Sequence, residues 1–131
     1  MRTECDELSW EGRLEACQQA IDYRFKNPEI LRRCLTHSSS APTRLDSNER
    51  LEFLGDSVLG ALISTRLLAQ FPTAAEGRLS RYKSRLVSER GLSLVAAVLD
   101  LGKFLYIGRG ELMNGGRTKI SLLANATEAL I

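Results

Sequence analysis

The segment from Glu49 to Leu68 constrains the fold more than any other part of the sequence, because it reads as one helix with two different sides. On an α-helix, at about 100° per residue, Glu49, Glu52 and Asp56 fall within an arc of roughly 60°. Apolar residues occupy the opposite side, and beyond Asp56 they surround nearly the whole helix. The pattern predicts a central, deeply buried helix whose first turns present three carboxylates.

These three carboxylates predict a cation site. Carboxylates this close repel one another unless a cation lies between them, and oxygen-only ligands suit a hard divalent ion such as Mg²⁺. Acidic residues in a first helical turn also interact favourably with the helix dipole, which explains Glu49 without any function. Asp56 lies beyond that turn and beside an apolar segment, where an unpaired carboxylate costs desolvation energy. We therefore favour a metal site over a solvated helix face.

A second polar pair lies near the end of the chain. Asn125 and Glu128 are three residues apart, so on a helix they share one face, and small and apolar residues surround them. Such a pair alone is more often structural and hydrogen-bonded than a ligand set. The pair matters because it could complete a metal site with the acidic arc, by which we mean Glu49, Glu52 and Asp56.

The remaining sequence reads as helices joined by short loops, which predicts an all-α, single-domain fold. Asn27 and Pro28 are typical of a helix start, with Asn as the cap and Pro in the first turn. No segment alternates apolar and polar residues as a strand does. Apolar spacing predicts helices over residues 8–25, 28–37, 49–71, 79–87 and 92–101, and from about residue 119 onwards.

Composition argues against several classes of protein. The formal net charge of +2 is too small to indicate a nucleic-acid partner by itself. No run of about 18 or more apolar residues predicts a membrane-spanning helix, and the polar N-terminus lacks the apolar region of a secretory signal. Three cysteines without Cys-x-x-Cys spacing indicate reduced thiols. We therefore expect a cytoplasmic protein with no membrane partner.

One stretch resembles the signature of the ribonuclease III endonuclease domain, namely Asn48-Glu-Arg-Leu-Glu-Phe-Leu-Gly-Asp-Ser57. The resemblance extends over nearly the whole chain. It includes Leu35-Thr-His-Ser-Ser39, Glu76-Gly77, Ser80-Arg81, Leu101-Gly102, Gly108, Gly110-Glu111, Gly115-Gly116 and Leu123-Ala-Asn-Ala-Thr-Glu-Ala-Leu-Ile131. Ordered matches of this kind make a chance resemblance improbable.

The resemblance implies an all-helical domain that works as a homodimer and cleaves double-stranded RNA, leaving 5′-phosphate and 3′-hydroxyl ends with short 3′ overhangs. It implies Mg²⁺ as the cofactor, with Mn²⁺ as a substitute, and no small-molecule cofactor. It also assigns roles to residues: metal binding to Glu52, Asp56, Asn125 and Glu128, catalysis to Asp56 and Glu128, acidic cleft positions to Glu49 and Glu76, and insertion into a pocket of the partner subunit to Phe53.

Such a site needs no side-chain nucleophile. A divalent metal lowers the pKa of water for attack on a backbone phosphorus, and its charge stabilises the leaving 3′ oxygen. His37 is the only histidine, and we expect it to have a structural hydrogen-bonding role in the second helix.

One position departs from the family pattern, because Asn125 stands where the family usually has Asp. A carboxamide oxygen can bind a metal but brings no charge, so we predict weaker metal binding. The alternative is a ribonuclease III-like module that has lost catalysis and serves in RNA binding or assembly. A helical protein-interaction module without RNA is a third option, and it would leave the acidic arc unexplained.

The stretch from Arg78 to Arg90 is basic, as solvated helix faces often are. Arg81, Lys83 and Arg85 are candidates to contact the phosphates of an RNA duplex. The chain ends at Ile131 inside an expected helix, which the resembled family usually continues. We therefore expect residues 1–131 to be a C-terminally truncated ribonuclease III catalytic domain, with no double-stranded-RNA-binding domain among them.

Overall fold

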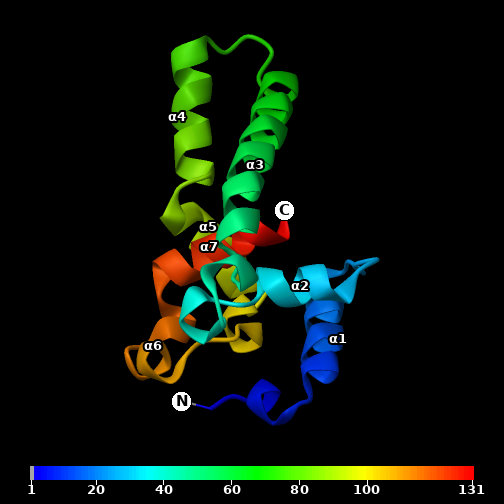
Figure 1. Cartoon of the computed structure of the whole chain (residues 1–131). Helices are drawn as coiled ribbons and strands as arrows, with labels where there is room; N and C mark the ends of the chain where they lie inside the picture. The colour runs from blue at the N-terminus through cyan, green and yellow to red at the C-terminus, as the bar shows by residue number, and fades with distance from the viewer. Residues whose placement is uncertain (1) are drawn as a thin grey trace.

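The computed structural model describes residues 2–131, which form helices with short connections (Figure 1). The α-helices are α1 (Trp10–Ile21), α2 (Pro28–Cys34), α3 (Glu49–Gln70), α4 (Glu76–Leu86), α5 (Glu89–Val98), α6 (Arg109–Met113) and α7 (Ile120–Leu130). Short 3₁₀ helices lie between them: η1 (Glu4–Glu7), η2 (Ser38–Ser40), η3 (Arg44–Asp46), η4 (Leu101–Phe104) and η5 (Gly116–Thr118). The all-α prediction is confirmed. Among residues 2–131, no helix has the length and apolar character needed to span a bilayer.

Local sequence explains where several helices begin and end. Asn27 caps α2 by accepting a hydrogen bond from the Glu29 backbone N–H, and Pro28 is the first helical residue. Ser88 caps α5 in a similar way. The helix predicted over residues 8–25 is shorter in the structure, because Asp22 adopts a left-handed conformation (φ 52°) that ends α1 at Ile21.

The centre of the body is α7, which packs most extensively against α3 and α5. The main hydrophobic core joins α1, α2, η4 and α7, and both Leu31 and Phe104 are fully buried within it. Cys5, Cys17 and Cys34 are buried free thiols. Burial raises the pKa of both Cys17 and Cys34 to about 12, so these thiols are unreactive packing groups.

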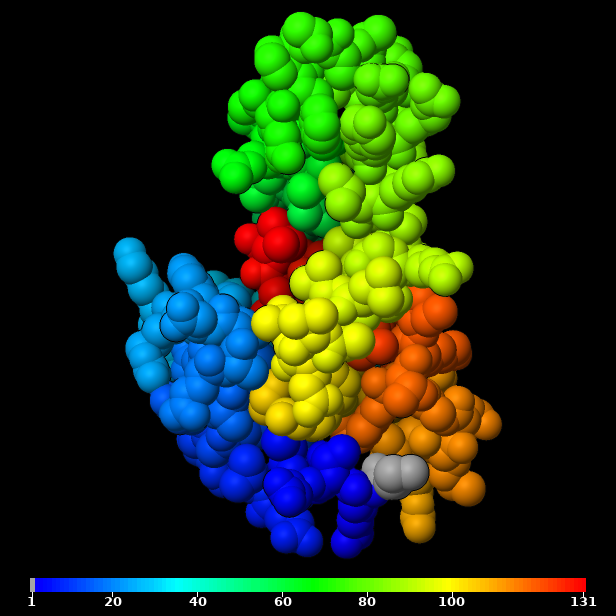
Figure 2. All heavy atoms as spheres, turned by 180° about the vertical axis from the view of Figure 1, so that it is seen from behind, coloured from blue at the N-terminus to red at the C-terminus, as the bar shows by residue number. Residues whose placement is uncertain are grey.

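A hairpin of α3 and α4 projects from this body (Figures 1 and 2). The prediction that α3 is the most buried helix is wrong, because only Gly55, Leu59 and Leu67 of α3 are buried in the chain from residue 2 to 131. Phe53 is 80% exposed and Leu62 is 57% exposed. An apolar pattern does not distinguish burial within one chain from burial against a second molecule, and exposed apolar faces mark interaction surfaces.

A buried ion network ties the N-terminal segment to the body. Asp6 contacts Arg13 Nη2 at 3.1 Å and Arg117 Nη2 at 2.6 Å. Both arginines also donate hydrogen bonds to the backbone carbonyl of Leu105, and Arg13 donates to that of Cys5. Because Arg117 lies in η5, directly before α7, the network holds the N-terminal segment beside the start of that helix.

Candidate metal centre

The acidic arc of α3 and the polar pair of α7 meet where the two helices cross. Gly55 makes this approach possible, because a Cβ atom built there would overlap the backbone carbonyl of Glu128. Gly55 lies between Glu52 and Asp56, so the crossing brings both of these side chains toward α7. Two stretches that lie far apart in sequence, one ending at Asp56 and the other beginning at Asn125, therefore converge in space.

Burial and neighbouring carboxylates raise the pKa of two glutamates at this crossing. Burial raises the pKa of Glu128 from 4.5 to about 7, and the charges of Asp56 and Glu52 add to the shift. Burial also raises the pKa of Glu52, where Glu49 and Asp56 add to the effect. Among residues 2–131, no basic side chain forms an ion pair with Glu52, Asp56 or Glu128. The site therefore carries negative charge that the described chain does not neutralise.

A fourth carboxylate, that of Glu89, lies near enough to raise the pKa of both Glu52 and Glu128. Glu89 is the first residue of α5, which packs on α7, and Ser88 caps that helix. Sequence reasoning missed Glu89 because an acidic residue directly after a Ser cap reads as an ordinary helix start. We call Glu52, Asp56, Glu89 and Glu128 the acidic cluster.

Asn125 faces the acidic cluster from α7. With its amide nitrogen turned toward acceptors, the side chain donates to Glu52 Oε1 at 3.3 Å and to the Ser121 carbonyl oxygen at 3.0 Å. An ionised aspartate could make neither bond and would add a further negative charge. Asn125 thus gives Glu52 part of the stabilisation that a cation would otherwise supply.

The two other acidic candidates differ in position. Glu49 lies one turn before Glu52, raises the pKa of Glu52 and contacts Arg44 at 3.8 Å, so it borders the acidic cluster. Glu76 begins α4 at the far end of the hairpin, where it accepts a hydrogen bond from Ser80 at 2.6 Å (Figure 1). A single copy of this chain does not bring Glu76 to the acidic cluster.

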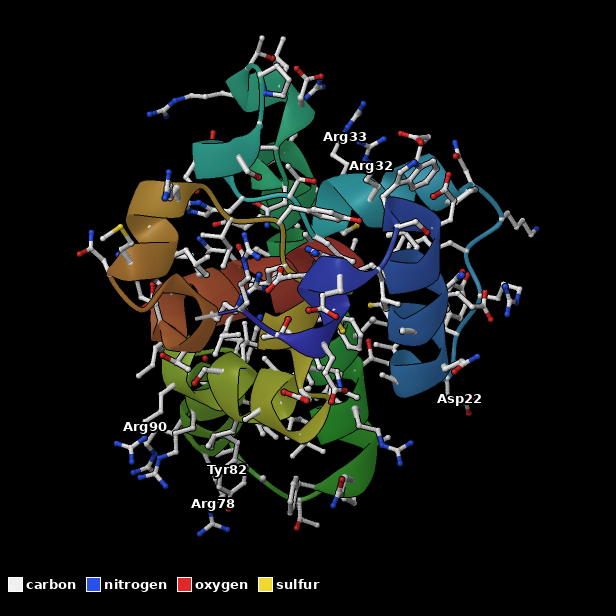
Figure 3. The ribbon with its side chains drawn as sticks, turned by 90° about the horizontal axis from the view of Figure 1, so that it is seen from below. Asp22, Arg32, Arg33, Arg78, Tyr82 and Arg90 are labelled. Carbon is white, nitrogen blue, oxygen red and sulfur yellow. The ribbon has the colours of Figure 1, made fainter. Side chains whose placement is uncertain are left out.

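Phe53 and the basic residues of α4 lie outside the cluster. Phe53 points away from the core and, with Leu54 among other residues, lines a shallow hollow of about 630 Å³. Arg81 and Arg85 are exposed on α4, whereas Lys83 is half-buried and presents less of its charge to solvent. Figure 3 shows that the side chains of Arg78 on α4 and Arg90 on α5 also point outward. The hairpin thus carries an exposed aromatic and an exposed basic surface.

The donor set suits a hard divalent cation. Carboxylate and carboxamide oxygens are ligands for Mg²⁺, which keeps several of its waters and needs few direct protein contacts. Within residues 2–131, no three His, Cys, Asp or Glu side chains lie close enough together to enclose a metal by themselves. The residues therefore fit an ion held by few carboxylates and by water, and the unneutralised charge of the acidic cluster favours such an ion.

Known proteins are similar in sequence. A family model described as Ribonuclease-III-like matches residues 27–131. The ribonuclease 3 of Solibacter usitatus is 52% identical over 120 residues, which cover 85% of this chain and 44% of that protein. The ribonuclease 3 of Magnetococcus marinus is 48% identical over 127 residues, which cover 90% of this chain and 51% of that protein. The chain thus spans about half the length of the curated relatives it matches.

Solved structures are similar in fold. The nuclease domain of ribonuclease III from Campylobacter jejuni superposes with a TM-score of 0.85 at 39% identity, covering 89% of this chain and 80% of that one. That structure is described as showing flexibility in a region involved in dimer formation. A second structure of the same nuclease domain gives a TM-score of 0.82 at 40% identity, covering 88% of this chain and 78% of that one.

Proposed function

The chain belongs to the ribonuclease III-like family, and we propose that it is a metal-dependent endoribonuclease domain that cleaves double-stranded RNA. The acidic cluster is the observation that carries the proposal, because carboxylates from α3, α5 and α7 meet there without a positive partner. We assign catalysis to Asp56 and Glu128, and further metal binding to Glu52 and Asn125. The likeness to nuclease-domain structures supports assigning the whole chain to that domain.

The acidic cluster and Asn125 would hold Mg²⁺, or Mn²⁺ in its place, at the crossing of α3 and α7. When bound, the ion would supply an activated water for attack on a backbone phosphorus and positive charge opposite the leaving 3′ oxygen. The chain's own contribution is positional: Gly55 sets the spacing of the two helices, and Asn125 orients Glu52 by a hydrogen bond. The products would carry 5′-phosphate and 3′-hydroxyl ends with short 3′ overhangs.

Cleavage of a long RNA duplex tests this proposal. We expect cleavage with Mg²⁺ or Mn²⁺, none with EDTA, and a loss of at least about a hundredfold in rate for Glu128→Gln. Glu15→Gln is the matched control, because Glu15 pairs with Arg24 on the surface of α1. Cleavage that persists in EDTA, or an equal effect of the two substitutions, would overturn the assignment.

A catalytically impaired RNA-binding or assembly module is the second candidate, and Asn125 is the observation that favours it. The hydrogen bond from Asn125 to Glu52 partly replaces a cation, so the site has less need of one. Binding of the duplex without cleavage at saturating Mg²⁺ would select this candidate. Absence of binding would instead indicate an interaction module without RNA.

We also propose that the chain acts as a homodimer through the exposed side of α3. Phe53 is 80% exposed, and the hollow of about 630 Å³ beside it includes Leu45 and Leu54 in its lining. In a two-fold symmetric dimer the same surface of both subunits forms the interface, so the Phe53 of each subunit can enter the hollow of the other. We expect Phe53→Ala to shift the chain to monomer in sedimentation, while Tyr23→Ala, which alters another exposed aromatic, in the connection after α1, does not.

The exposed Arg81 and Arg85, with a smaller contribution from Lys83, would contact phosphates of the duplex. Replacing both arginines with Gln should weaken RNA binding and reduce its dependence on salt.

Three free thiols are typical of a reducing compartment, so we propose the cytoplasm as the site of action.

A further inference from the structure

His37 lies in a rigid turn between α2 and η2, and the acidic cluster does not use it. Its backbone N–H donates to the Tyr106 carbonyl at 2.9 Å. Ser40 Oγ donates to the same carbonyl at 2.8 Å, and the Gly108 N–H donates to Ser39 Oγ at 2.8 Å. A side chain at Gly108 would overlap the backbone of Ser39, so the two segments are in close contact. The turn, and with it the position of His37, is therefore fixed.

Hydrogen bonds determine which imidazole nitrogen carries the proton. Nδ1 of His37 accepts from the Ser39 N–H at 3.2 Å and lies 2.7 Å from Ser39 Oγ. Because Ser39 Oγ already accepts from Gly108, its own hydrogen can point to Nδ1. Nδ1 is thus an acceptor twice over, and in the neutral ring the proton must be on Nε2. His37 thus has the structural hydrogen bonds that we expected, but they use Nδ1 only, and the residue lies after the end of α2 and not within it.

The second nitrogen, Nε2, belongs to a half-buried ring, and its N–H is free. Among residues 2–131, none accepts a hydrogen bond from Nε2, and the only buried side-chain nitrogen or oxygen without a partner is Arg117 Nε. Nε2 is therefore accessible to a ligand. Burial of the ring lowers the pKa of His37, with nearby Lys119 acting in the same direction, and outweighs the carboxylates of Glu111 and Glu49, so the ring is neutral near pH 7.

Glu49 connects His37 with the acidic cluster, because it borders that cluster and its charge also acts on the His37 ring. Glu49 begins α3, and Gly55 at the crossing lies six residues further on, which is about 9 Å of helix. Glu111 and Lys119 form an ion pair at 2.9 Å next to the ring. The carboxylates of Glu49 and Glu111 are paired with Arg44 and Lys119, so the surroundings carry no net positive charge to attract a phosphate, and a neutral acceptor fits the free N–H better.

We propose that the Nε2–H of His37 donates a hydrogen bond to a 2′-hydroxyl of bound duplex RNA and so helps the domain to distinguish RNA from DNA. The inference rests on the proposed function, since it requires a duplex on the acidic cluster. Proteins read duplex RNA largely through its shape and its 2′-hydroxyls, and a prepositioned neutral donor fits that task. His37 would be a binding residue and would take no part in the chemical step.

Two substitutions by amide side chains distinguish the role of Nδ1 from that of Nε2. His37→Asn places an acceptor near Nδ1 and removes the Nε2 donor, whereas His37→Gln places an amide N–H near Nε2. Binding is measured with RNA and DNA duplexes of one sequence, in Mg²⁺ and in the Glu128→Gln background, so that the RNA stays intact. We expect His37→Asn to weaken RNA binding about fivefold and leave DNA binding unchanged, and His37→Gln to recover most of the loss.

A second measurement covers the case in which His37→Asn does not fold. Single 2′-deoxy substitutions are moved along the RNA duplex, and with His37 present one position per site should lose about fivefold in affinity. In the folded His37→Asn variant the same substitution should have no further effect. Equal weakening of RNA and DNA by His37→Asn, or a deoxy scan without a sensitive position, would overturn the inference alone. Absence of any RNA binding would remove the proposed function as well.

Discussion

Two groups of partly buried charges lie toward opposite ends of α7 and differ in how their charges are balanced. Beside the start of α7, the buried ion network places one carboxylate, that of Asp6, between the guanidinium groups of Arg13 and Arg117. Near the end of α7, the acidic cluster brings carboxylates together with no basic partner within residues 2–131. The first group is satisfied by the chain itself, and the second is not.

The pKa values of Asp6 and Glu128 reflect this difference, because the first is lowered and the second is raised. At Asp6, burial raises the pKa, but the Thr3 backbone N–H and the two arginines outweigh it and lower the pKa below 3.8. At Glu128, burial and like charges act together and raise the pKa to about 7. A satisfied charge stabilises the fold, whereas an unsatisfied one costs stability and creates affinity for a ligand. Substitutions that neutralise either group should therefore have opposite effects.

The largest effect is expected for Asp6→Asn, which keeps the shape of the side chain and removes its charge. Two mostly buried guanidinium groups would lose their counter-ion, so we expect a loss of about 3 kcal/mol in the free energy of unfolding at pH 7. The lowered pKa means that this contribution persists above pH 3.8 and is lost as the pH falls below it. Urea unfolding of the variant, with exposed Glu7→Gln as the control, measures the difference, and equal midpoints would contradict it.

The next effect is expected at Gly55, whose missing side chain lets like charges crowd together. In Gly55→Ala the new Cβ would meet the Glu128 carbonyl, so α3 and α7 must separate, at about 2 kcal/mol of stability. Separation should also move the pKa of Glu128 back toward 4.5. Gly77→Ala is the matched control, because a Cβ there meets nothing within 4 Å and should be neutral or stabilising. A carboxyl titration followed by NMR measures the pKa, and an unchanged Glu128 would contradict the proposed cause.

Sequence reasoning succeeded where the controlling interactions are local. The cap at Asn27 and Pro28 fixes the start of α2, and the spacing of Glu52 and Asp56 fixes which side of α3 they share. The motif also led us to expect Glu128 opposite Glu52 and Asp56, because it covers both stretches of sequence, and the structure places Glu128 on α7, which crosses α3. These features depend on helix geometry or on a motif, and either is readable from residues alone.

The same reasoning missed features that depend on contacts distant in sequence. Asp6 and Arg117 are 111 residues apart, and no periodicity links them. Glu89 joins the acidic cluster only because α5 packs on α7. The exposure of Leu62 on the apolar face of α3 was missed for another reason: the pattern predicts that an apolar face is covered, but it does not say which molecule covers it.

A smaller effect, with the opposite sign to that of Asp6→Asn, is expected for Glu128→Gln. Its raised pKa means that the folded state holds the proton more tightly, so stability falls as the pH rises from 4.5 toward 7. In EDTA at pH 8, the variant should therefore be more stable than the natural chain by about 1 kcal/mol, since solvent screens part of the interaction. The gain should disappear at pH 4. Thermal unfolding at both pH values checks this, and a variant that is less stable at pH 8 would contradict it.

The smallest change in stability, and the most informative about ligand binding, is expected for Asn125→Asp. The substitution removes the hydrogen bond to Glu52 and adds a negative charge, so in EDTA at pH 8 we expect a loss of about 0.5 kcal/mol. Mg²⁺ should reverse the sign, because the added charge strengthens cation binding, and cleavage should reach half its maximum at a several-fold lower Mg²⁺ concentration. Asn114→Asp makes the same chemical change at an exposed position directly after α6 and should leave both measurements unchanged. If the natural chain and Asn125→Asp show equal dependence on Mg²⁺, the carboxamide is not part of the metal centre, and the charge deficit of the acidic cluster must be met by another group.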